Sequence, residues 1–239
     1  MASLDEACAS VKAWQQYFYE FNHEMSASGR RGTQYRGSDW ITNRRVVVYP
    51  TAGTLEHVGP VMHGMADLVD SLGLDFSIVS CESDSIDNMV HLSSKRTKLR
   101  FNRLAEFLVS WRFDRDDPSP HGVVVIVPHY LRGKCNSDNT GPKLASDSTC
   151  GVGSFGAGYV VMSVPPGKTY DVAQIAKHEA GHLLGLNPHH DRYRVNGYAD
   201  SNCVMHASSS GSAMCGKCRD ALWHFWKGIE YRTGKKYFK

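Results

Sequence analysis

Apolar residues in this chain form two kinds of pattern, short continuous runs and stripes with helical spacing. The continuous runs cover residues 46–50, 76–81, 123–128 and 159–164. Runs without polar alternation are typical of strands that are covered on both faces. The stripes, in which an apolar residue recurs every three or four positions, cover residues 4–25, 55–72, 98–113, 172–184 and 215–228. This spacing predicts helices, and strands that alternate with helices predict an α/β or α+β fold.

Polar and glycine-rich stretches separate these elements. Residues 26–38 are rich in Gly, Arg, Ser and Thr, so we expect residues 1–40 to form a helix and connector that precede a domain of residues 41–239. Residues 129–149 predict a long polar loop. The glycines of residues 151–158 lead into a strand and lack the Lys and Ser/Thr ending of a phosphate-binding loop. They predict a bent or bulged strand whose exposed edge can pair with an extended peptide.

The clearest chemistry lies in the helix predicted over residues 172–184, on a different face from its apolar stripe. His178 and His182 are four residues apart, so a helix places both imidazoles on one face, within reach of one metal ion. Glu179 follows the first histidine, where its carboxylate can act on a metal-bound water instead of on the metal. This is the arrangement of zinc peptidases, with two ligands and a general base on one helical turn.

The end of this helix suggests a third ligand. Gly185 stands where a helix can end in a left-handed residue, and Pro188 makes continuation of the helix unfavourable. A chain that reverses at this point can return either His189 or His190 to the same metal ion. At the start of the helix, Asp171 is placed to act as the N-cap.

Cysteines form a second candidate metal site. The Cys215-x-x-Cys218 turn places two thiolates on one ion, Cys203 supplies a third, and a structural tetrahedral zinc needs one more ligand. The candidates for the fourth ligand are His190, Asp191 and His206. We favour His190, because it neighbours the first site.

Composition narrows the class of protein. The chain has 239 residues, a net charge of +3 and seven cysteines, an odd number that argues against a complete disulfide framework. No apolar run approaches the ~20 residues that span a bilayer, and the first residues lack the pattern of a signal peptide. We therefore expect a cytoplasmic protein without a membrane partner. The basic clusters lack interleaved aromatic residues, so we expect no nucleic-acid partner.

The combined motifs resemble those of the archaemetzincins, metzincin-clan zinc peptidases with a second, four-ligand zinc site. The motifs read His178-Glu179-x-x-His182-x-x-Gly185, Cys203-x-Met205 and Cys215-x-x-Cys218. The resemblance implies an upper lobe of twisted mixed sheet with packed helices, residues 41–185, and a small zinc-stapled lower lobe, residues 186–239. It also implies that Met205 is the Met-turn residue beneath the catalytic zinc.

The chain departs from the family pattern near the third ligand. Pro188 stands where the family has its third histidine, which a cysteine follows directly. With a turn one residue longer, the resemblance assigns His189 to the catalytic zinc and His190 to the place of that cysteine. The loop from His190 to Cys203 is longer than in the family, and the loop from Met205 to Cys215 is shorter.

These observations predict a zinc metallopeptidase, a hydrolase that acts on peptide or protein substrates and binds two zinc ions per chain. His178, His182 and His189 hold the catalytic zinc, whose open position takes a water that Glu179 deprotonates. The second zinc stabilises a lobe with little core of its own. The alternative is a non-catalytic, zinc-stabilised binding module, in which Glu179 would be dispensable. Endopeptidase and aminopeptidase activity both remain open.

Overall fold

The computed structural model describes residues 43–113, 121–133, 144, 149–154, 158–186, 202–206 and 211–239. A five-stranded sheet with strand order β2-β1-β5-β8-β7 lies at its centre. The strands are β1 (Arg45–Pro50), β2 (Ser77–Ser80), β5 (Gly122–Val127), β7 (Gly151–Ser154) and β8 (Tyr159–Ser163). Four strands are parallel, and β7 runs antiparallel to β8 at one end of the order. The mixed sheet confirms the predicted fold class.

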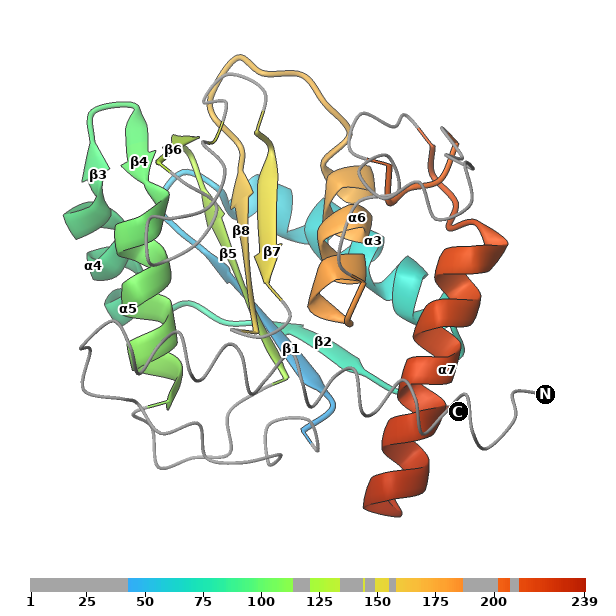
Figure 1. Cartoon of the computed structure of the whole chain (residues 1–239). Helices are drawn as coiled ribbons and strands as arrows, with labels where there is room; N and C mark the ends of the chain where they lie inside the picture. Colours follow the sequence, from blue (N-terminus) through green and yellow to red (C-terminus); the bar gives the residue numbers. More distant parts are fainter. Residues whose placement is uncertain are drawn as a thin grey trace.

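Helices cover both faces of this sheet (Figure 1). Side chains at Val46 and Val48 of β1 share a core with three helices, while Val47 and Tyr49 share the opposite core with two. The first three are α3 (Val58–Ser71), α6 (Val172–Leu183) and α7 (Gly216–Thr233), and α3 follows a short 3-10 helix, η1 (Leu55–His57). The other two are α4 (Asp84–Ser93) and α5 (Phe101–Phe113). The continuous valine runs are thus explained, because both faces of β1, β5 and β8 are buried.

A small second sheet was not predicted from the sequence. It consists of β3 (Ser94–Lys95), β4 (Lys98–Arg100) and β6 (Tyr130–Arg132), in the order β3-β4-β6. The helix expected over residues 98–113 therefore begins three residues later, and the loop expected over 129–149 contains a strand. Leu99 and Leu131 are the paired residues that face the core. The expected N-terminal helix and connector, residues 1–40, lie outside the described residues.

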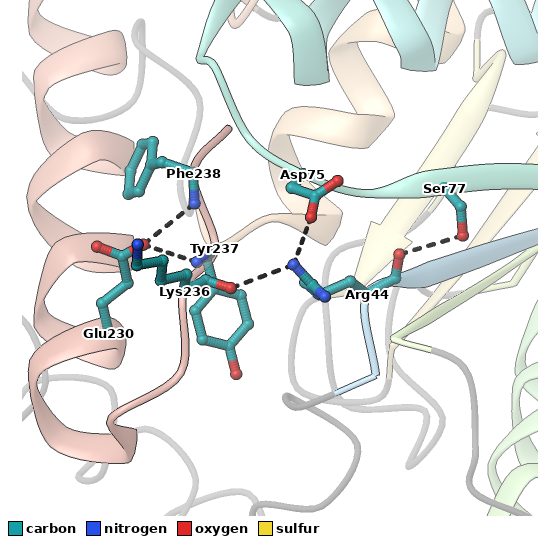
Figure 2. Close-up of polar contacts among 7 residues, drawn as sticks. All are labelled: Arg44, Asp75, Ser77, Glu230, Lys236, Tyr237 and Phe238. Atoms are coloured by element: carbon teal, nitrogen blue, oxygen red, sulfur yellow. Dashed lines mark hydrogen bonds and ion pairs between the residues drawn. The ribbon is translucent and has the colours of Figure 1, made fainter.

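The C-terminal tail folds back along α7 onto the start of the sheet. Gly234 ends α7 in the left-handed conformation, and the Glu230 carboxylate then accepts backbone N–H groups from Tyr237 at 2.6 Å and Phe238 at 3.1 Å (Figure 2). Arg44 forms an ion pair with Asp75 and donates to the Lys236 carbonyl at 3.3 Å. These bonds connect α7 to the strands that it covers.

Within the described ranges, no helix combines the length and the apolar character needed to cross a bilayer. The apolar stripe of α7 instead faces the protein interior. Leu222, Trp226 and Ile229 are buried in the same core as α3 and α6, as expected for a closing helix.

Candidate metal centre

Helix α6 carries the predicted ligands, and its ends are those expected from the sequence. The Asp171 carboxylate accepts the backbone N–H of Gln174 at 3.0 Å, which is the predicted N-cap. At the other end Gly185 has a φ of 116°, in the region that favours glycine. The Leu186 N–H then donates to the Gly181 carbonyl at 2.9 Å. This reversal turns the carbonyl of Leu186 back toward the helix.

His178 and His182 meet with their outer nitrogens facing each other. The two Nε2 atoms are 3.2 Å apart. Each Nδ1 lies against a backbone carbonyl, His178 at 2.6 Å from Val204 and His182 at 2.7 Å from Leu186. A carbonyl accepts only from a protonated nitrogen, so each ring in its neutral form carries its proton on Nδ1 and leaves a lone pair on Nε2.

Two facing lone pairs are unfavourable unless a cation lies between them, and the measured separation suits zinc. At 3.2 Å, two Zn–N bonds of about 2.05 Å enclose an angle of about 103°, close to the tetrahedral value. The carbonyl partners are the outer contacts that metal-bound histidines normally have. The geometry of this pair therefore fits a zinc ion. His189 and His190, the predicted third ligand and its neighbour, lie outside the described residues.

Glu179 is buried beside the two histidines. The residue is only 5% exposed, and its Oε2 has no hydrogen-bond partner among the described residues. Burial raises the pKa of Glu179 to about 7, although the charge of His178 and the backbone N–H of Gly153 act in the opposite direction. A carboxylate with such a pKa can take up and release a proton near neutral pH.

Strand β7 covers this carboxylate closely. A Cβ added at Gly151 would lie 2.6 Å from Glu179 Oε1, and one added at Gly153 would lie 2.9 Å from Oε2. Both positions therefore require glycine. The described strand has no bulge, since residues 151–154 pair with 159–162 in regular register, and residues 155–157 of the glycine-rich stretch lie outside the described residues. The glycines instead allow α6 to lie close to β7. Because glycine has no side chain, the run of glycines in the sequence could have suggested this alternative.

The turn that contains Met205 lies under the same helix. A Cβ on Gly181 would overlap the Met205 sulfur and lie 3.0 Å from its Cε. Gly181 is the residue before His182, and Met205 fills the space that this glycine leaves free. The neighbouring Val204 carbonyl is the one that accepts from His178. This carbonyl and that of Leu186 are site groups that sequence reasoning missed, because backbone atoms carry no residue signature.

The three predicted cysteine ligands also come together. The sulfur atoms of Cys203, Cys215 and Cys218 lie within 4.8 Å of one another. The Cys203 and Cys218 sulfurs are 3.9 Å apart, too far for a disulfide but matching an angle of about 116° between Zn–S bonds of about 2.3 Å. His206 is described but does not join this group, whereas His190 and Asp191 lie outside the described residues.

The thiols differ in their readiness to lose a proton. A hydrogen bond from Cys218 lowers the pKa of Cys203 to about 5, and backbone N–H groups of Cys215 and Met205 contribute against the effect of burial. The pKa of Cys218 is raised, mainly because it donates to Cys203, and burial raises that of Cys215. Cys203 is therefore the first thiolate of the cluster, and the cluster as a whole can hold a metal ion.

Comparisons with known proteins support the fold. No protein-family profile matches the sequence, and no curated protein sequence is significantly similar to it. Among solved structures, archaemetzincin from Methanopyrus kandleri is similar with a TM-score of 0.52 and 18% sequence identity. The match covers 81% of this chain and 99% of that one. The protein therefore has an archaemetzincin-like fold.

Proposed function

We propose that this protein is a zinc-dependent peptidase whose active site is the His178–Glu179–His182 face of α6. The observation that carries the proposal is the pair of Nε2 atoms that face each other 3.2 Å apart, with a buried carboxylate beside them. Neither feature is needed for folding, since facing lone pairs and a buried acid both destabilise the metal-free protein. The archaemetzincin-like fold supports the same conclusion.

Zinc in such a site supplies a Lewis acid that polarises a carbonyl group and lowers the pKa of a bound water. The chain provides the remaining chemistry. Val204 and Leu186 hold the two imidazoles in the ligand tautomer. Glu179 accepts a proton from water and returns it to the leaving amine. Strand β7 is the last strand of the sheet and lies against Glu179, so an extended peptide aligned along β7 would place its backbone beside the base.

The remaining ligands are part of the proposal. His189 completes the catalytic set, and His190 joins Cys203, Cys215 and Cys218 at a second, structural zinc. Alanine replacement of His189 should remove the catalytic metal, whereas replacement of His190 should remove the structural one. Zinc analysis of both variants against a parent that holds two ions tests the assignment. Loss of the catalytic metal from His190→Ala would mean that the roles are exchanged. Three cysteines kept as thiols suit the reducing cytoplasm, which is the proposed compartment.

The test of the activity is Glu179→Gln, which keeps the shape of the side chain and removes the base. Cleavage of a quenched fluorescent peptide pool should fall by about 10²–10⁴-fold, the contribution of a positioned acid–base group, with zinc content unchanged. Glu56→Gln, at an exposed acid on the 3-10 helix, is the matched control. Equal cleavage by Glu179→Gln would refute the peptidase, and a zinc-loaded parent that cleaves nothing would favour the binding module.

A further inference from the structure

Three consecutive buried residues contact both candidate metal sites. Cys203 places its sulfur in the thiol cluster, Val204 offers its carbonyl to His178 at 2.6 Å, and Met205 packs against Gly181. The turn is held internally, since the His206 N–H donates to the Cys203 carbonyl at 2.9 Å. It is also held from outside, since the Val204 N–H donates to the Ala213 carbonyl at 2.8 Å.

We propose that metal occupancy of the Cys203–Cys215–Cys218 cluster sets the metal affinity of the His178–His182 pair, with Val204 and Met205 as the positioning residues. The proposal rests on the proposed function in one respect, namely that the histidine pair binds zinc. It adds a thermodynamic coupling between the two sites.

The physical reason lies in how weakly the thiols alone hold this turn. Without an ion, the Cys203 sulfur is held by the Cys218 thiol at 3.9 Å and the Cys215 N–H at 3.4 Å, both weak bonds to sulfur. An ion replaces these with metal–thiolate bonds and fixes the sulfur of Cys203. The backbone carbonyl of Cys203 and the neighbouring residue Val204 are then fixed too, because they belong to the same tight turn.

The effect reaches the histidine through the Val204 carbonyl. This carbonyl keeps the proton of His178 on Nδ1 and orients the ring, and loss of such an outer partner typically lowers metal affinity by about 10–100-fold. Met205 supplies a second constraint, because its sulfur already occupies the space next to Gly181. A turn displaced toward α6 would press on the helix one residue before His182.

Coupling of this kind must be reciprocal. If an ion in the thiol cluster strengthens binding at the histidines by some factor, an ion at the histidines strengthens binding in the cluster by the same factor. A variant that disturbs only the contact between turn and helix should therefore weaken the thiol cluster as well, although it removes no thiol. This property distinguishes coupling from the simple loss of a ligand.

The first arm uses the full chain with Cys218→Ser and measures the Zn²⁺ affinity of the histidine site by competition with a chromophoric chelator. Loss of that binding in His182→Ala assigns the site. We expect the dissociation constant to rise about 10–100-fold in Cys218→Ser. The control Cys81→Ser, at an exposed cysteine outside both sites, should bind like the parent. An unchanged constant in Cys218→Ser would overturn the proposal.

The second arm uses Gly181→Ala, which keeps every proposed ligand and adds a methyl group against Met205. Titration with Co²⁺, read by thiolate-to-cobalt charge-transfer absorption, should show weaker binding at the cysteines, with the circular dichroism spectrum unchanged. Undiminished cobalt–thiolate affinity would overturn the proposal, and this arm decides alone if Cys218→Ser does not fold. Neither arm measures cleavage, so an inactive but coupled protein would refute the proposed function only.

Discussion

Gly64 of α3 tests how tightly α6 is held. It is buried where α3 crosses the first turn of α6. A Cβ at this position would lie 2.7 Å from the carbonyl carbon and 3.0 Å from the Cα of Ala173, and closer still to the carbonyl oxygen. Ordinary contact begins at 3.4 Å, so the helices would have to separate by at least about 0.7 Å. The obstacle is backbone, which cannot rotate away.

Gly64→Ala therefore reverses the sign that helix propensity alone predicts. Alanine gains about 1 kcal/mol over glycine inside a helix, whereas overpacking costs about 1–3 kcal/mol and more where backbone must move. We expect a net loss of about 1–2 kcal/mol in the free energy of unfolding. At about 2–4 °C per kcal/mol for a chain of this size, the midpoint of thermal unfolding should fall by about 2–8 °C.

Equilibrium urea unfolding followed by circular dichroism measures this loss. Gly59→Ala is the matched control in the same helix, because Gly59 is exposed and a Cβ there meets nothing within 4 Å. Its free energy of unfolding should rise by up to about 1 kcal/mol, because the gain in helix propensity is not offset by a clash. A Gly64→Ala protein as stable as the parent would refute the close approach of α3 and α6.

Two further substitutions test the contacts of α7. Burial acts to raise the pKa of Glu230, but hydrogen bonds from Lys227, Tyr237 and Phe238 outweigh it and the pKa is lowered. Glu230→Gln should cost about 1 kcal/mol at pH 7, and urea titrations should show the difference vanishing as pH falls through the folded pKa; a pH-independent difference would contradict this. Trp226→Phe leaves the Leu184 carbonyl without its donor at 3.1 Å and should lower the free energy of unfolding by about 1–3 kcal/mol. An unchanged free energy in the same urea measurement would contradict this prediction.

The central strands and α6 were predictable because their signals are local. The valine runs of β1 and β5 reflect burial on both faces, and Asp171 marks the start of α6 with its own side chain. In contrast, β4 and β6 were missed because each is three residues long with a single buried side chain. Their stability comes from pairing between residues 32 positions apart in the chain, which no local pattern records.

The candidate site divides in the same way. The spacing of His178, Glu179 and His182 follows from helical geometry, so the sequence alone predicts that these three residues lie together on α6. The Val204 carbonyl, which orients His178, comes from a turn 26 residues away. The requirement for glycine at residues 151 and 153 depends on where α6 passes β7. Both features depend on the tertiary structure. A sequence pattern could therefore indicate these residues but not why they are needed at these positions.

The C-terminal end of α6 shows how the rest of the chain sets the ligand geometry. The last carbonyls of a helix lack partners within the helix. Here Leu183 and Leu184 accept from the buried rings of His121 at 3.2 Å and Trp226 at 3.1 Å. The helix then ends at a fixed point, and the Leu186 carbonyl is left to accept from His182.

The orientation of His182 thus depends on β5 and α7 as well as on its own helix, because His121 immediately precedes β5 and Trp226 lies in α7. α7 begins beside Cys215 and carries Cys218 in its first turn, and its far end is tied to the sheet through Glu230 and Arg44 (Figure 2). A metal ion that bound at either proposed site would therefore bind a conformation that the whole fold maintains. Its binding free energy must appear as stability of that fold, because the unfolded chain has neither site preformed.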